Sequence, residues 1–143
     1  MKNYYSCLAF GILAIVCHGS WMQPIMVMLL STSLLHHGRK EQEYAEKRLI
    51  YWLDTLMAHT IALWSMYDAI SMKIPLHVLQ YIGLYWMCLS YVIMVFYVTR
   101  LSFSDGSHGE RWHASTHVVS SIGMYNLYLA QKQTGQLYKP TLW

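Results

Sequence analysis

The sequence predicts an all-α integral membrane protein, a helical bundle of about five transmembrane helices in a single domain over residues 1–143. Composition is the first observation: 55% of the residues are hydrophobic and only 12% are charged, about half the charged share of a soluble protein. The second is the aromatic content, which includes 12 Tyr and 6 Trp, residues that suit bilayer interfaces and bundle interiors. The third is that charge occurs in clusters that separate five apolar segments.

The first two apolar segments, residues 4–17 and 21–35, are short for a bilayer core, which takes about 20 helical residues. We expect a tight helical hairpin, because Gly19 favours a turn between the segments and Pro24 suits a first helical turn. The alternative is one long broken helix, which would reduce the bundle to four helices. Lys2 and the apolar run after it also resemble a secretory signal, but a small-residue cleavage pattern is lacking, so we expect a retained helix.

The three later segments, residues 49–71, 75–99 and 112–130, are each long enough to span a bilayer. Five alternating spans put the N-terminus and the loops 36–48 and 101–111 on one side, with seven Lys or Arg against three on the other. The positive-inside rule then predicts a multi-pass protein whose basic side faces the cytoplasm, or the matrix or stroma in an organelle. The basic side holds Lys2, Arg39, Lys40, Lys47, Arg48, Arg100 and Arg111, and the other side holds Lys73, Lys132 and Lys139.

Polar side chains fall at one depth in three of these predicted helices. Ser33 and His37 are four residues apart at the end of the second segment, so they share a helix face. Asp54 lies about one and a half turns inside the third segment. His113 and His117 open the last segment, again four residues apart. We therefore expect these groups to meet near the basic side of the bundle.

This combination of side chains suits a metal-dependent hydrolytic site. Ionisable groups inside membrane helices are costly, which makes each a candidate functional residue. His113 and His117 can reach one ion, and His37 from a neighbouring helix completes three imidazoles, leaving a fourth position for water as catalytic zinc requires. Asp54 could orient a ligand or accept a proton, and Ser33 could hydrogen-bond the water or a substrate carbonyl.

Each of these residues also has a simpler interpretation. Two His near an interface can extend to lipid headgroups, Ser33 can bond back to its own helix, and Asp54 can pair with Arg48. Their joint placement favours the metal site. His36 is rotated by about 100° from His37 and is expected to face elsewhere, although it remains an alternative ligand. His59, on a different face from Asp54, could contact the ligands from outside.

The cysteine pattern and the net charge reduce the number of functional classes that fit the sequence. Cys7, Cys17 and Cys88 lie in apolar runs without CxxC spacing, so we interpret them as small buried hydrophobes. The net charge of +3 is small and dispersed, which excludes a nucleic-acid-binding face.

Three short motifs resemble the CREST superfamily of membrane hydrolases, which includes the alkaline ceramidases, the adiponectin receptor family and the Myomaker-like proteins. They are SerLeuLeuHisHis at residues 33–37, Asp54 in TyrTrpLeuAspThrLeu, and TrpHisAlaSerThrHis at residues 112–117. The family normally has seven helices, so this chain would be a shortened form.

The resemblance implies that His37, His113 and His117 bind Zn²⁺, while Ser33 and Asp54 assist the metal-bound water. It also implies hydrolysis of a lipid amide or ester bond, as in the ceramidase branch, which cleaves an N-acyl sphingoid base. Membrane lipids would then be both surroundings and substrate, and a homo-oligomer could complete a cavity for the acyl chain.

Two other classes of function remain open on the sequence. The chain could be a non-catalytic accessory or structural subunit of a larger membrane complex, and such a subunit could carry haem. Haem needs axial ligands on opposite faces, so His113 or His117 would have to pair with His36 or His37. A proton or ion pathway through Asp54 and the histidines is the third class.

Overall fold

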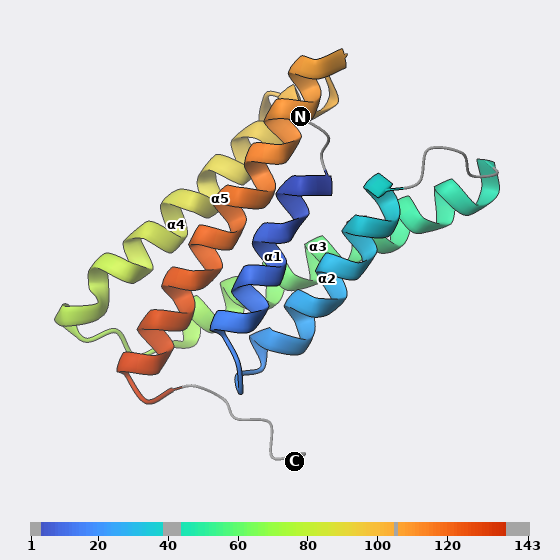
Figure 1. The fold of residues 1–143 in the computed structure, drawn as a ribbon. Coiled ribbons are helices and arrows are strands. Elements are labelled where there is room, and N and C mark those ends of the chain that lie inside the picture. Colours follow the sequence, from blue (N-terminus) through green and yellow to red (C-terminus); the bar gives the residue numbers. More distant parts are fainter. Residues whose placement is uncertain (1–3, 39–43, 105, 137–143) are drawn as a thin grey trace.

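The computed structural model describes residues 4–38, 44–104 and 106–136, and the regular elements within them are all helical. This confirms the all-α prediction with five α-helices (Figure 1). Short helical segments flank the fourth helix: the 3-10 turn η1 before it, and the π-helix η2 and 3-10 turn η3 after it. The elements are α1 (Tyr4–Val16), α2 (Met22–Gly38), α3 (Tyr44–Ser71), η1 (Leu76–Val78), α4 (Leu79–Ile93), η2 (Met94–Val98), η3 (Leu101–Phe103) and α5 (Gly106–Gln133).

The helices α1 and α2 form the expected antiparallel hairpin (Figure 1). Gly19 in the connecting turn has φ +78°, a left-handed conformation that glycine adopts without a Cβ penalty. The Ser20 hydroxyl donates to the Cys17 carbonyl at 2.7 Å and closes the turn. Pro24 lies in the first turn of α2, as predicted. The alternative of one broken helix is therefore not observed.

The last helix, α5, packs between α1 and α4 (Figure 1). Its contact with α4 is close at Gly123, where a Cβ would lie 2.9 Å from the Cβ of Cys88. The third helix, α3, packs mainly against α2 and touches α5 at few positions. This arrangement brings the C-terminal end of α2 and the N-terminal half of α5 to the same end of the bundle (Figure 1).

The start of α5 differs from the prediction. The helix begins at Gly106, whereas the apolar segment begins at Trp112, so His113 lies about two turns and His117 about three turns inside the helix. His108, within the predicted loop 101–111, is also helical. The apolar segment marks only the part of a helix that suits a bilayer, while the intrahelical hydrogen bonds continue into polar sequence.

The predicted fourth span is a composite of η1, α4 and η2. In η2 the Thr99 N–H donates to the Met94 carbonyl at 2.8 Å, five residues back, and Arg100 then ends the helix at φ +55°. Among the described residues, one helix, Leu76–Val98, is long and apolar enough to cross a membrane by length and composition. The segment Tyr5–Val16 is a shorter apolar helix.

Candidate metal centre

Three histidines predicted as ligands come together from α2 and α5. The ring centroid of His37 lies 5.0 Å from that of His113 and 5.4 Å from that of His117. The rings of His113 and His117, one turn apart on α5, are 4.8 Å apart. Of the three, His117 is the most enclosed, with 8% of its surface exposed. The sequence spacing therefore does place three imidazoles in one cluster.

The donor atoms define two groups that could hold one ion. In the first, Cys7, His37 and His117 each offer an atom within 4.8 Å of the others. In the second, the same holds for His36, His37 and Asp54. His37 belongs to both groups. A tetrahedral zinc with nitrogen at about 2.0–2.1 Å and sulfur at about 2.3 Å needs donors about 3.3–3.6 Å apart, so contraction by about 1 Å would suffice.

One donor atom in this cluster lacks a partner. The Nε2 atom of His37 is buried, and no hydrogen-bond partner for it occurs within residues 4–38, 44–104 and 106–136. A buried polar atom without a partner is costly, and a bound ion would satisfy it. The residues present therefore fit a metal at this position.

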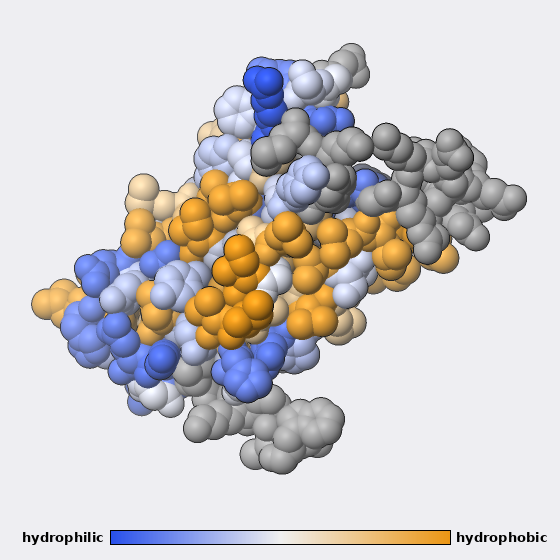
Figure 2. Space-filling view, viewed as in Figure 1, coloured by the Kyte–Doolittle hydropathy of each residue, from blue (hydrophilic) through white to orange (hydrophobic). Residues whose placement is uncertain are grey.

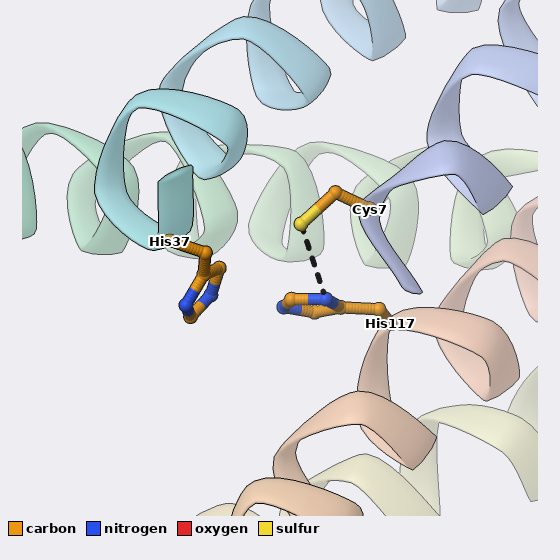
Figure 3. Close-up of side chains that lie close together, drawn as sticks. All are labelled: Cys7, His37 and His117. Carbon is orange, nitrogen blue, oxygen red and sulfur yellow. Dashed lines mark hydrogen bonds between the residues drawn. The ribbon is translucent and has the colours of Figure 1, made fainter. Parts of the chain in front are cut away.

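The ring of His117 is held from α1. The Ser6 hydroxyl oxygen lies 2.8 Å from His117 Nδ1, and Cys7 Sγ lies 3.6 Å from the same nitrogen. Figure 3 shows the other ring nitrogen of His117 on the side of His37. Nδ1 of His117 therefore faces Ser6 and Cys7, while the other ring nitrogen faces His37. Sequence reasoning missed Ser6 and Cys7, because they lie in an apolar run with no motif.

Asp54 is fixed by two hydroxyl groups of α2. The Ser33 hydroxyl donates to Asp54 Oδ1 at 2.6 Å, and the Thr32 hydroxyl donates to the same oxygen at 3.1 Å. Ser33 therefore binds the carboxylate directly. Thr32 is a further site residue that the sequence analysis did not identify. Its position next to Ser33 in the sequence could have indicated it. The predicted pairing of Asp54 with Arg48 is not tested, because the structure describes the backbone of Arg48 and not its side chain.

His36 also reaches the cluster, which corrects the expectation that it faces elsewhere. Its ring centroid lies 4.6 Å from that of His37, and it lines the same cavity as Asp54. A rotation of about 100° between neighbouring residues separates their Cβ directions, but two imidazoles at a helix end are long enough to reach one groove.

His59 lies on the same cavity but in neither donor group. Its Nδ1–H donates to the Thr55 carbonyl at 2.7 Å, so its Nε2 accepts from the Tyr97 hydroxyl. His59 therefore connects α3 to η2. The expected contact between His59 and the clustered imidazoles is not observed.

A cavity of about 200 Å³ begins at this cluster and extends between α2, α3, α4 and α5. Along α5 its lining runs from His113 to Met124, a span of about 16 Å at 1.5 Å per residue. Asp54 is the one formally charged side chain in the lining among the described residues. In such apolar surroundings a carboxylate beside imidazoles would be stabilised by a cation. Apolar lining residues include Met26, Leu29, Ile61, Leu89, Val92 and Phe96.

Comparison with known proteins gave no match among family models, curated proteins or solved structures.

Proposed function

We propose that this chain is a multi-pass membrane protein that binds zinc at its imidazole cluster and hydrolyses an amide or ester bond of a lipid. One observation carries the proposal. The cavity of about 200 Å³ has Ser33, Asp54 and the imidazoles at one end and a mainly apolar lining along the rest. Such a cavity suits a molecule with a polar linkage next to a hydrocarbon chain.

Membrane insertion is supported by the exposure of apolar side chains. In the helix Leu76–Val98 only 17% of the most apolar window is buried inside the structure, whereas a core helix of a soluble protein would be mostly buried. On α3, Leu63 and Ile70 are 67% and 70% exposed. Figure 2 shows a hydrophobic band across the middle of one face, with hydrophilic surface toward the ends. An apolar surface of this extent suits contact with lipid.

The cluster would face the cytoplasm, or the matrix or stroma in an organelle, because the loops predicted to carry more Lys and Arg flank its helices. Of those basic residues, Lys2, Arg39 and Lys40 lie outside the described residues. Retention of the protein in the membrane pellet after an alkaline carbonate wash would support insertion, and its release into the supernatant would contradict it.

The ion would be held by imidazoles of the cluster, His37 and His117 with His113 beside them. Zinc supplies Lewis acidity that polarises a carbonyl group and makes water more acidic. A single ion fits this cluster better than haem, the alternative cofactor. The centroids of His37 and His113 are only 5.0 Å apart and those of His37 and His117 are 5.4 Å apart, which leaves no slot for a macrocycle between them.

Asp54 would move the proton in the reaction. Hydrogen bonds from Ser33 and Thr32 both go to Oδ1 and fix the orientation of the carboxylate. Asp54 would accept a proton from water as the water oxygen bonds to the acyl carbon. It would then give that proton to the nitrogen or oxygen that leaves when the amide or ester bond breaks. Ser33 acts through Asp54 in this scheme.

The test uses the full chain, loaded with zinc in mixed micelles, and an N-acyl sphingoid base or a diacyl phospholipid. Release of fatty acid, measured by mass spectrometry, is the expected result. Asp54→Asn should lose this activity and keep zinc. Asp68→Asn is the matched control, because Asp68 lies at the other end of α3, where Gln131 donates to it at 3.0 Å. Failure of zinc-loaded protein to release fatty acid from either lipid would refute the hydrolase.

A second candidate is a non-catalytic subunit of a larger membrane complex or homo-oligomer. It is favoured by the aromatic side chains that α3 exposes, Trp52 at 57%, Trp64 at 53% and Tyr67 at 68%. Aromatic residues are enriched where proteins pack together. In that case a stoichiometric partner, or a second copy, should co-purify in mild detergent, and His37→Ala should leave the assembly intact.

A further inference from the structure

Cys7 lies against the imidazole cluster from a helix that the three-histidine site does not use. It is fully buried, with 0% of its surface exposed. Its Sγ is 3.6 Å from His117 Nδ1, and it belongs to the donor group that also contains His37 (Figure 3). The three residues come from α1, α2 and α5.

The spacing of these atoms is close to that of a tetrahedral metal site. With Zn–S of about 2.3 Å and Zn–N of about 2.0–2.1 Å, a sulfur and a nitrogen on one ion lie about 3.6 Å apart. The Cys7 Sγ to His117 Nδ1 pair is already at 3.6 Å, and all three donors lie within 4.8 Å of one another. A thiolate is also a strong ligand for zinc.

His113 is less well placed than Cys7 to bind the same ion as His37 and His117. Its ring packs against His37 and His117, with centroid distances of 5.0 Å and 4.8 Å, yet it belongs to neither donor group. It also lines the cavity, where it can hydrogen-bond a bound molecule.

We propose that Cys7, His37 and His117 are the three protein ligands of the metal, with Cys7 in place of His113. This assignment depends on the proposed function in one respect, which is that a metal ion binds at this cluster. On binding, the S–H bond of Cys7 breaks, a metal–sulfur bond forms and the proton leaves to solvent, with no change in oxidation state. Three protein ligands leave one position for water or substrate, which is the number found in catalytic zinc sites.

Cobalt(II) binding to the full chain in detergent tests the assignment. The expected result is an intense thiolate-to-cobalt charge-transfer band in the near ultraviolet. Cys7→Ser should lose the band and bind Co²⁺ at least about tenfold more weakly, since one of three ligands is gone. Cys17→Ser is the matched control, because Cys17 is equally buried at 0% and belongs to neither donor group. Cys17→Ser and His113→Ala should both keep the band.

X-ray absorption of the zinc-loaded wild-type protein supplies a measurement that needs no variant. It should show one sulfur at about 2.3 Å beside nitrogen or oxygen at about 2.0–2.1 Å. Cobalt spectra without the charge-transfer band, together with loss of metal in His113→Ala, would overturn the assignment of Cys7 and leave the zinc hydrolase intact. A wild-type protein that binds neither Co²⁺ nor Zn²⁺ would overturn both.

Discussion

The Ser33 hydroxyl lies 2.6 Å from Asp54 Oδ1 and donates a hydrogen bond that joins α2 to α3. Ser33 is 1% exposed, so this contact is shielded from solvent. A separation of 2.5–2.7 Å is typical of a hydroxyl bound to a charged carboxylate, which is stronger than a neutral pair. The bond therefore sets the position of the carboxylate at the polar end of the cavity.

Loss of this hydroxyl should destabilise the bundle. We expect Ser33→Ala to lower the free energy of unfolding by about 1–2 kcal/mol, because a hydrogen bond to a carboxylate is lost in a buried position. Ser31→Ala is the control, since Ser31 is exposed on the same helix and bonds only locally to the Val27 carbonyl at 2.8 Å. Denaturant unfolding in detergent measures both, and equal effects of the two variants would contradict the prediction.

Zinc content should depend on His37 above all, because His37 is the one residue shared by both donor groups. We expect the purified wild-type protein to hold about one zinc per chain and His37→Ala to hold almost none. His18→Ala, in the exposed turn between α1 and α2, should keep the wild-type content. Metal analysis by mass spectrometry reads this out directly, and zinc retained by a folded His37→Ala protein would show that the ion binds elsewhere.

Alanine substitutions at two glycines should change the stability of the protein in opposite directions. At Gly123 the added Cβ would lie 2.9 Å from Cys88 Cβ, so Gly123→Ala should lower stability by about 1–3 kcal/mol as α4 and α5 separate. At Gly83, within α4, no heavy atom apart from its chain neighbours and its own helix backbone lies within 4 Å of the added Cβ. Gly83→Ala should therefore raise stability by about 0.5–1 kcal/mol through helix propensity. Thermal unfolding of the two variants compares them, and a shift of the same sign in both would count against the close approach.

Under the proposed lipid hydrolysis, the length of the cavity should determine which acyl chains are cleaved. Ala62 lines the cavity on α3, so Ala62→Phe should slow cleavage of long-chain lipids more than of short-chain lipids. Its zinc content should be unchanged. Leu63→Phe is the control, because Leu63 is 67% exposed and is absent from the lining. An equal loss on both chain lengths would indicate that the cavity does not hold the acyl chain.

The fold was predictable where the signals are local. Gly19 and Pro24 mark the hairpin, and the long apolar runs mark three of the five helices. The convergence of His37, His113 and Asp54 could be predicted from their equal depth in the apolar segments, because residues at one level of adjacent helices lie close together. The start of α5 was missed, because apolar content marks where a helix suits apolar surroundings rather than where its hydrogen bonds begin.

The contribution of α1 to the site could not be predicted from the sequence. Ser6 and Cys7 have no spacing that indicates a ligand, and only the packing of α1 against α5 brings them to His117. His36 was placed on the wrong side because an ideal helical wheel treats side chains as short and radial. Both errors concern distances between helices. A sequence pattern along one helix carries no information about such distances.

The π-helix η2 means that the chain has one residue more between Ile93 and Thr99 than a regular α-helix would need. Side chains that follow the insertion, including Tyr97, are rotated by about 100° from the positions that a continued α-helix would give them. The face by which α4 packs against α5 is therefore set independently of the face that Tyr97 presents to His59. Deletion of one residue between Ile93 and Tyr97 would return this turn to the phase of α4 and rotate Tyr97 away from α3, while the packing of α4 at Gly123 stayed in register.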